Sequence, residues 1–268
     1  MYEDPNETAI EDAENLSSKL IFEIIRREGL EELSRPNRSL LWSGIAAGLL
    51  ISLSVLGEAV FRTHLPDTPA RHLIENLGYS LGFIVVILGR MQLFTENTIT
   101  TVLPVMRDPR PQMFTRMMSL WGIVLVANLI GAFIAAYVFA YTSAIPAELR
   151  PAIEELSRHA TGFGASDAFQ RGIPAGVLIA AIVWMLPESD GFGFFVIVTF
   201  TWLIAAGDFT HVIAGSVEMA YLLVQGMLQP YGAVFGFFLP VLAGNVLGGT
   251  AIFALLAFGQ VRNELNKS

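Results

Sequence analysis

The stretch Leu93-Phe94-Thr95-Glu96-Asn97-Thr98-Ile99-Thr100-Thr101-Val102-Leu103-Pro104 places a carboxylate, an amide and four hydroxyl groups inside an apolar segment. A helix that faces lipid along its whole length does not favour such residues, because their polar groups would lack hydrogen-bond partners. Polar or irregular backbone at membrane depth is tolerated only where it is buried in protein or lines a water-filled cavity. The stretch therefore predicts a path through a bilayer, with the rest of the chain as its scaffold.

The composition of the 268-residue chain is that of a polytopic membrane protein. Hydrophobic residues make up 53% and charged residues 15% of the chain, and the mean hydropathy is +0.56. An average soluble domain has about 25% charged residues. The absence of cysteine excludes disulfides and thiolate metal sites, and the four scattered histidines do not suggest a zinc site. The net charge of −8 argues against a nucleic-acid partner, and no cofactor is expected.

Six apolar segments are expected to cross the membrane as helices, in an all-α fold. They are residues 40–61, 77–106, 114–141, 172–186, 191–226 and 231–258, with an amphipathic helix at 146–161 between the third and the fourth. The second and fifth segments exceed the roughly 20 residues that a bilayer core requires. Polar residues interrupt both of them, the fifth at Gly207-Asp208-Phe209-Thr210-His211. The second and fifth helices are therefore predicted to be broken.

The ends of the chain are expected to lie outside the membrane. Residues 1–37 comprise an acidic tail and an amphipathic helix, capped by Ser17 or Ser18, that lies on the membrane surface or against the bundle. Residues 38–262 form the six-span domain, and residues 263–268 form a polar tail. The acidic start lacks the features of a signal peptide. Six spans place both termini on one side, and the positive-inside rule predicts that this side is the cytoplasm.

Three motifs occur twice in the same order. Ser43-Gly44-Ile45-Ala46-Ala47-Gly48 matches Arg171-Gly172-Ile173-Pro174-Ala175-Gly176, Phe94-Thr95-Glu96 matches Phe209-Thr210-His211, and Asn128-Leu129-Ile130-Gly131 matches Asn245-Val246-Leu247-Gly248. The matches predict a duplication, with halves at about 38–145 and 165–260. Because each half has three spans, the second half must be inverted relative to the first, and the two breaks should meet near the midplane.

The combined motifs resemble the formate/nitrite transporter family across residues 38–262. Leu93-Phe94-Thr95, His211 and Gly244-Asn245-Val246-Leu247-Gly248 carry the resemblance. The run from Leu93 to Thr98, together with Gly207-Asp208 and Gly215-Ser216-Val217-Glu218, is similar to a branch of inner-membrane proteins within the family. The resemblance implies an aquaporin-like fold, a homopentamer with a pore in each protomer, and small monovalent anions such as formate or nitrite as substrates.

His211 is the leading candidate for a pore residue. A neutral imidazole can donate a hydrogen bond to an anion, and a protonated one adds a charge and could pass a proton to a weak-acid anion. The alternative is a structural histidine bonded to a backbone carbonyl. Thr95 and Thr210 could offer hydroxyl groups to a passing ion, or bond back to their own helices.

Two acidic residues accompany the breaks. The repeat predicts that Glu96 is related to His211 by the two-fold axis, so that the two could interact; a protonated carboxyl or a salt bridge with Arg90 are the alternatives. Asp208 is expected either to cap the second half of the fifth helix or to belong to the transport site.

The remaining candidates are apolar, basic or amide side chains. Leu93, Phe94 and Phe209 could form constrictions that exclude hydrated ions, with plain packing as the alternative. Arg171 could attract anions at a pore mouth or extend to the lipid headgroups. Asn97, Asn128 and Asn245 are expected to support the site, the last two by hydrogen bonds to the loops or between helices.

The sequence therefore predicts an inner-membrane transporter or channel for a small monovalent anion, linked to a proton through His211. One alternative is a channel for a neutral small solute or a protonated weak acid. Another is a membrane sensor or scaffold that transports nothing. An enzyme is not expected, because no nucleophile with its base, metal cluster or phosphate loop is recognisable.

Overall fold

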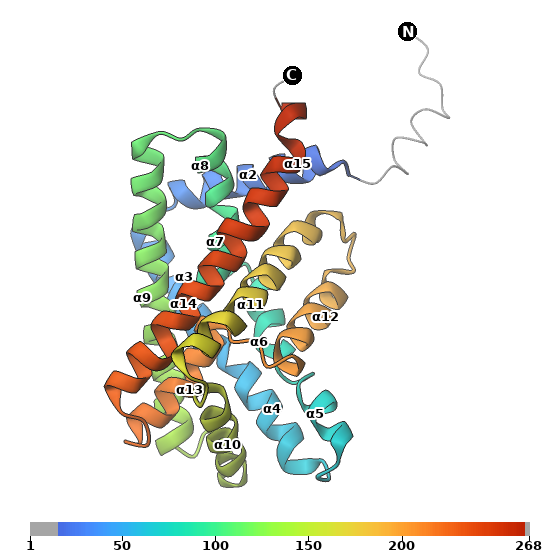
Figure 1. Ribbon diagram of the computed structural model, residues 1–268. Coiled ribbons are helices and arrows are strands. Elements are labelled where there is room, and N and C mark those ends of the chain that lie inside the picture. The colour runs from blue at the N-terminus through green and yellow to red at the C-terminus, as the bar shows by residue number, and fades with distance from the viewer. Residues whose placement is uncertain (1–15, 266–268) are drawn as a thin grey trace.

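A computed structural model describes residues 16–265 of the chain, and over that range the protein consists of helices and their connections (Figure 1). The expected acidic tail before residue 16 lies outside the described residues. The helices are α2 (Ser18–Ser34), α3 (Asn37–Leu50), α4 (Ser52–His64), α5 (Pro69–Glu75), α6 (Ser80–Leu88), α7 (Phe94–Thr100), α8 (Val102–Arg107), α9 (Pro111–Tyr141), η1 (Ala147–Leu149), α10 (Arg150–Thr161), α11 (Ala165–Met185), η2 (Leu186–Glu188), α12 (Gly193–Ala206), α13 (Val212–Val224), η3 (Gly232–Phe238), α14 (Leu239–Val246), η4 (Leu247–Ala254) and α15 (Leu255–Leu265).

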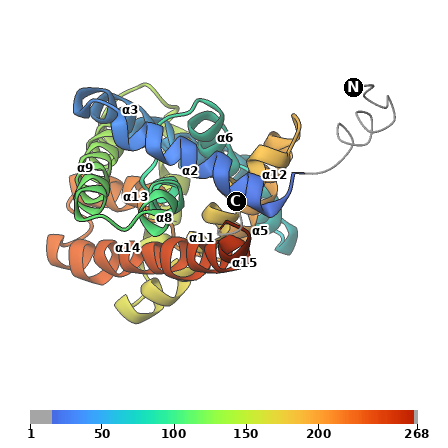
Figure 2. The same ribbon diagram turned by 90° about the horizontal axis from the view of Figure 1, so that it is seen from above.

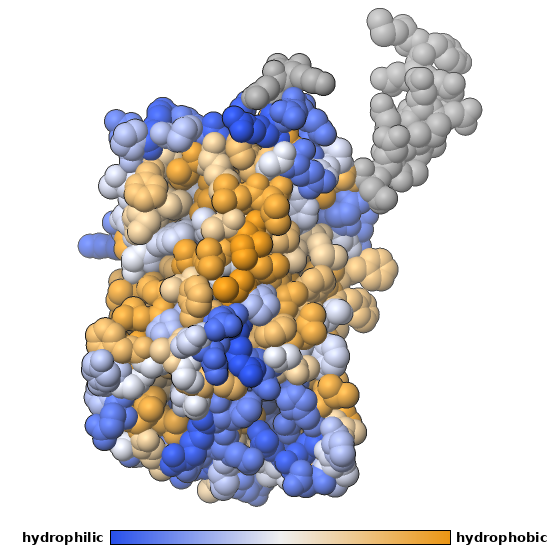
Figure 3. Space-filling view, in the orientation of Figure 1, coloured by the Kyte–Doolittle hydropathy of each residue, from blue (hydrophilic) through white to orange (hydrophobic). Residues whose placement is uncertain are grey.

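Five helical stretches of the described chain are long and apolar enough to cross a membrane. They are Asn37–His64, Pro69–Leu88, Pro111–Tyr141, Ala165–Glu188 and Gly232–Leu265. The fifth expected segment instead contains two shorter apolar helices, α12 and α13. On the face seen in Figure 3, apolar side chains predominate across the middle of the molecule and polar side chains gather at both ends. This distribution is the one that a bilayer requires of a multi-pass protein.

Helical structure extends beyond several of the expected spans. Helical structure in the second segment begins at Pro69, not Leu77, because Pro69 occupies a favourable position in the first turn of α5. The fourth helix begins at Ala165, seven residues before Gly172. The last helix continues to Leu265, so the first residues of the expected polar tail are helical. Polar residues at helix ends outside the bilayer do not stop a helix, which is why hydropathy alone places these boundaries poorly.

The amphipathic helix α2 is confirmed, and it lies across one end of the bundle (Figure 2). The Ser17 hydroxyl oxygen accepts a hydrogen bond from the backbone N–H of Leu20 at 3.3 Å, as expected for an N-cap. One face of α2 is buried against the bundle through Ile21, Phe22, Ile25 and Leu33. On the other face, a hydrogen bond from Arg26 lowers the pKa of the Glu23 carboxyl to about 2.

Both described ends of the chain lie at the same end of the molecule (Figure 1). There α15 packs against α2, and the Gln260 side-chain amide donates a hydrogen bond to the Ser18 hydroxyl at 2.9 Å. The opposite end of the molecule is formed by α10, α5 and the end of α4.

Two helix pairs of the bundle pack closely. Helix α3 packs along α9, and α11 packs along α14 and η4. At the first crossing a Cβ on Gly48 would overlap the backbone carbonyl of Asn128, and at the second a Cβ on Gly176 would overlap that of Asn245. The two asparagines are therefore held where the helix backbones approach most closely, which fixes their positions relative to the linkers described below.

Alanine at Gly48 or Gly176 is expected to destabilise the protein by about 1–3 kcal/mol, the usual cost of forcing extra volume into a packed contact. Gly122→Ala, also in a spanning helix, is the control, because nothing lies within 4 Å of an added Cβ there. The measurement is the thermal unfolding temperature of the detergent-solubilised protein. Equal unfolding temperatures for all three variants would contradict the close crossing.

Candidate functional site

Two short linkers interrupt the helices at matching places. Residues 89–93 join α6 to α7, and residues 207–211 join α12 to α13. Arg90 (φ 51°) and Asp208 (φ 53°) both have left-handed backbone conformations, which are uncommon for residues other than glycine. The residue after each closes the preceding helix in the same way: Met91 N–H donates to Val86 at 3.0 Å, and Phe209 N–H donates to Ile204 at 2.9 Å.

Asn128 of α9 holds the first linker. Its Oδ1 accepts a hydrogen bond from the backbone N–H of Phe94, the first residue of α7, at 2.9 Å. Its Nδ2 donates to the carbonyls of Gly44 and Gln92, both at 2.8 Å. The side chain is fully buried, so all three bonds form away from water. The expected supporting role of Asn128 thus has a defined geometry.

Asn245 of α14 makes the same three bonds to the second linker. Its Oδ1 accepts from the N–H of Val212, the first residue of α13, at 2.8 Å. Its Nδ2 donates to the carbonyls of Gly172 and Thr210, both at 2.9 Å. The bonds of Asn128 and Asn245 therefore pair Gly44 with Gly172, Gln92 with Thr210 and Phe94 with Val212.

This pairing shows that one predicted motif match is wrong. Phe94-Thr95-Glu96 does not correspond to Phe209-Thr210-His211, since the hydrogen bonds place Leu93, not Glu96, opposite His211. The motif match paired Phe94 with Phe209, whereas the hydrogen bonds pair Phe94 with Val212, which is three residues further along the chain. The residues that occupy equivalent positions, such as Leu93 and His211, share no chemistry, so the sequence could not reveal their correspondence.

His211 and Thr95 are bonded to each other where the starts of α13 and α7 meet. His211 is only 2% exposed, and its Nδ1 accepts a hydrogen bond from the backbone N–H of Ala214 at 3.2 Å. Because Nδ1 is an acceptor, the proton of the neutral ring lies on Nε2, which donates to Thr95 Oγ1 at 2.8 Å. The ring also meets Phe83 of α6 edge-on, with centroids 5.0 Å apart. Nothing in the sequence singled out Phe83.

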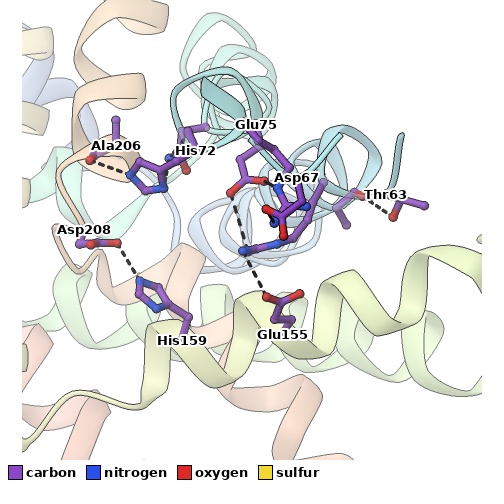
Figure 4. A network of polar contacts seen from close by, with 12 residues as sticks. Thr63, Asp67, His72, Glu75, Glu155, His159, Ala206 and Asp208 are labelled. Carbon is purple, nitrogen blue, oxygen red and sulfur yellow. Dashed lines mark hydrogen bonds and ion pairs between the residues drawn. The ribbon is translucent and has the colours of Figure 1, made fainter. Parts of the chain in front are cut away.

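A cavity of about 340 Å³ reaches His211 from the end of the molecule that carries α10; we call it the α10-side cavity. His211, Thr210 and Phe209 line it, together with the acidic residues Glu58, Glu75 and Glu218. At its mouth His159 Nε2 contacts Asp208 Oδ1 at 2.8 Å, and His72 Nε2 donates to the Ala206 carbonyl at 3.1 Å (Figure 4). His159 of α10 thus holds the second linker from outside, and His72 of α5 holds the last residue of α12 just before it.

A second cavity, of about 580 Å³, opens toward α2; we call it the α2-side cavity. Leu93, Glu96 and Asn97 line it, as do Arg90 of the first linker and two acidic residues of α2. Arg90 Nη1 pairs with Glu28 at 3.3 Å, and Gln92 Nε2 donates to Glu32 at 2.6 Å. The first linker is therefore held from outside by α2.

The two interactions proposed for Glu96 are not formed. Arg90 pairs with Glu28 instead, and Glu96 and His211 line different cavities. Arg90 lies in the α6 to α7 linker with a left-handed backbone conformation, and its side chain reaches Glu28 of α2, not Glu96. Asp208 does not cap α13 either, because His211 does so.

Other candidate residues hold the structure around the path. The Phe94 ring packs edge-on against Trp121 with centroids 5.6 Å apart, and Phe94 lines neither cavity. The Thr210 hydroxyl donates to the Ala168 carbonyl at 2.8 Å. Asn97 Nδ2 donates to Gln92 Oε1 at 3.2 Å, which braces the first linker.

Arg171 contacts Phe163 and the second linker. Its guanidinium lies 4.2 Å above the Phe163 ring, and its Nη1 donates to the Asp208 carbonyl at 3.2 Å. The side chain therefore supports the second linker, and it does not line the α10-side cavity.

Glu58 and Glu218 are cavity residues that sequence reasoning missed as individuals. Glu58 lies in the first spanning helix, and Glu218 appeared only as a letter in a family motif. The available signal was an ionisable residue inside a predicted span, which marks a functional site by default. Averaging hydropathy over a whole span conceals one such residue.

These features define a multi-pass helical membrane protein of the channel and transporter class: one polar cavity ends at a buried histidine, and a second opens at the other end of the bundle. Residues 19–259 match the family model described as Formate/nitrite transporter, and the chain belongs to this family. Its members are channels and transporters, not enzymes.

Relatives and solved structures agree with this assignment. The inner membrane protein YfdC of Escherichia coli K12 is 45% identical over 246 residues, which are 92% of this chain and 79% of YfdC. The formate channel FocA of Haemophilus influenzae is 30% identical over 156 residues, which are 56% of this chain and 54% of FocA. A solved structure described as a pentameric formate channel with formate bound superimposes with a TM-score of 0.74 at 20% identity, covering 85% of this chain and 98% of that one. The predicted family, its inner-membrane branch and the all-helical class are thereby confirmed.

Proposed function

We propose that this protein carries a small monovalent anion, similar to formate or nitrite, across the inner membrane together with a proton. The observation that carries the proposal is the His211–Thr95 hydrogen bond, buried between the α10-side and α2-side cavities. The formate channels among the related proteins and structures support the choice of substrate.

The architecture that we propose has six spans in two inverted halves, with broken second and fifth helices. The equivalent hydrogen bonds of Asn128 and Asn245 support this arrangement, because each asparagine joins the third helix of a half to its first helix and its linker. The described ends then face the cytoplasm by the positive-inside rule, and the α2-side cavity opens there. A homopentamer in the lipid bilayer, with one path in each protomer, is proposed by analogy with the pentameric formate channel.

The path is closed by apolar side chains near the linkers. Leu93 lines the α2-side cavity and Phe209 lines the α10-side cavity, so that an ion must shed water to pass either. Phe94, with its ring against Trp121, has no such role in this proposal. Between the two, the Thr95 hydroxyl receives the hydrogen of His211 Nε2 and keeps its own hydrogen to donate to the substrate.

A weak acid is well suited to such a path. Burying an ion without a partner is far more costly than burying a neutral polar molecule. An anion that gains a proton in the cavity crosses the apolar section as a neutral acid, and it can be held there by one or two hydrogen bonds. The Thr95 hydroxyl, oriented by His211, supplies such a bond on the way.

The alternative cargo is a neutral small solute, and one observation favours it. Carboxyl groups line both cavities, and their ionised forms would repel an approaching anion. Formate, nitrite and a neutral solute of similar size must therefore be compared directly.

Uptake into proteoliposomes between about pH 5 and pH 8 is the test, since this range spans the physiological titrations. We expect formate and nitrite uptake to rise as the external pH falls, while uptake of the neutral solute stays low at every pH. Uptake of the neutral solute without uptake of formate or nitrite would mean that the neutral solute, not the anion, is the substrate. Complete absence of flux would favour the sensor or scaffold.

A further inference from the structure

Two carboxyl groups in the α10-side cavity lack a hydrogen-bond or ion-pair partner within the described part of the chain. Glu58 of α4 is 5% exposed and Glu218 of α13 is 7% exposed, and both line the cavity that reaches His211. Among residues 16–265, neither carboxyl group takes part in a side-chain hydrogen bond or an ion pair. The two residues come from different helices that pack against each other, so their convergence on one cavity is a product of the fold.

The cations and other ionisable groups that face this cavity are engaged elsewhere. Arg62 lies 3.8 Å from Glu75 and 3.3 Å from Glu155. His159 is paired with Asp208. His72 donates to a backbone carbonyl, and the phenol of Tyr79 carries no positive charge. Within residues 16–265, no cation therefore lies within ion-pair distance of Glu58 or Glu218, and Arg62 attracts Glu58 only from farther away.

His211 is poorly placed to supply a proton itself. Its Nδ1 accepts the N–H of Ala214 at the start of α13, so adding a proton there would break the cap. Its Nε2 already donates to Thr95. In the neutral ring both nitrogens are occupied by bonds that hold the two helix starts together, and the ring can orient a substrate without exchanging a proton.

A protonated carboxyl group has the opposite properties. It carries no charge to repel an anion, it donates a hydrogen bond, and it can transfer its proton to a basic oxygen. An ionised carboxylate without a cation at this depth would be costly. An unpaired, buried carboxyl that opens into a transport cavity thus has the chemistry of a proton donor.

We propose that Glu58 and Glu218 are the groups that give the transported anion its proton, an inference that rests on the proposed function. The carboxyl O–H bond of one glutamate breaks as an O–H bond forms on the anion, which leaves a carboxylate and a neutral acid. The carboxylate takes up a proton from the water at the open side of the cavity. The neutral acid then moves on to His211 and Thr95. In the reverse direction the acid returns its proton to the carboxylate.

The test is the initial rate of formate uptake into proteoliposomes as a function of external pH. The variants are Glu58→Gln, Glu218→Gln and the double variant, which keep the size of each side chain and remove its acid. We expect each single variant to slow uptake, and the double variant to slow it by at least about tenfold and to lose its dependence on external pH, as expected when a proton-transferring group is removed. Glu58→Asp and Glu218→Asp, which keep the acid, should recover most of the rate and the pH dependence.

Glu148→Gln is the matched control, because Glu148 is an exposed carboxylate in the α9 to α10 connection that does not line the cavity. Wild-type uptake, unchanged uptake in Glu148→Gln and a flat pH profile in the double variant would together support the proposal. Wild-type rates in the double variant, or faster uptake through relief of repulsion, would overturn it and leave the proposed function intact. A wild-type protein that transports no formate would overturn both the proposed function and the proton-donor role of the two glutamates.

A second measurement tests the proposal if the glutamine variants do not fold. Infrared spectroscopy of the intact protein detects the C=O stretch of a protonated carboxyl group, and the two aspartate variants should shift this band without removing it. A wild-type spectrum with no protonated carboxyl band at neutral pH would overturn the proposal.

Discussion

His211→Phe should reduce formate uptake by about 10- to 100-fold, the equivalent of losing one or two hydrogen bonds to a charged or acidic substrate. Phenylalanine has no donor for Thr95 and no acceptor for the Ala214 N–H, so both bonds that define the centre of the path are lost. Its ring is similar in size to imidazole and still fits beside Phe83. The effect on uptake should therefore exceed the effect on folding. The measurement is initial uptake at several external pH values, with the unfolding temperature followed in parallel.

Two further variants sharpen the His211 prediction. Thr95→Val removes only the hydroxyl group and should reproduce most of the loss, and the double variant His211→Phe/Thr95→Val should be little worse than either single one, because the two side chains act as a unit. His64→Phe is the control for an added phenylalanine, since His64 is exposed at the end of α4. Uptake in His211→Phe that equals the wild type in rate and pH dependence would rule out a role for the histidine in the path.

Asn128→Leu and Asn245→Leu should each lower the free energy of unfolding by at least about 3 kcal/mol. Leucine removes one acceptor and two donors, and it leaves a backbone N–H and two carbonyls without partners in the interior, each at a cost of about 1–3 kcal/mol. The close crossings at Gly48 and Gly176 leave no room for water to replace them. The measurement is equilibrium unfolding in detergent, or the thermal unfolding temperature where unfolding is irreversible.

Asn37→Leu is the matched control for these substitutions, because Asn37 is exposed at the start of α3. It should change stability by less than about 0.5 kcal/mol. If the two halves are equivalent, Asn128→Leu and Asn245→Leu should lose similar amounts. A variant as stable as Asn37→Leu would mean that the asparagine bonds do not hold the linkers.

The family and the helical class could be predicted from sequence, because they depend on long apolar segments and on short motifs that tolerate small errors of alignment. Asn128 and Asn245 were matched correctly, since both halves require the same amide at the same crossing. Register at the linkers could not be predicted. The positions before α7 and α13 hold leucine and histidine, and no pattern of letters relates these two residues.

The partners of individual side chains could not be predicted from the sequence either. Arg90 and Glu96 are close in sequence and opposite in charge, and these two properties alone predict a salt bridge. The left-handed conformation of Arg90 directs its side chain to Glu28 instead, 62 residues earlier in the chain. Similarly, nothing in the sequence around Glu58 indicates that α4 and α13 present their carboxyl groups to a common cavity.

The two linkers are held from opposite ends of the molecule. Glu28 and Glu32 of α2 contact the first linker. His159 of α10 contacts the second, and His72 of α5 contacts the end of α12 directly before it. A change of pH, ionic strength or binding partner at one end of the molecule thus acts directly on the contacts of one linker. Its effect reaches the other linker only through the packed interior of the bundle. Each linker therefore responds directly to the solution at its own end of the molecule and not to the solution at the other end.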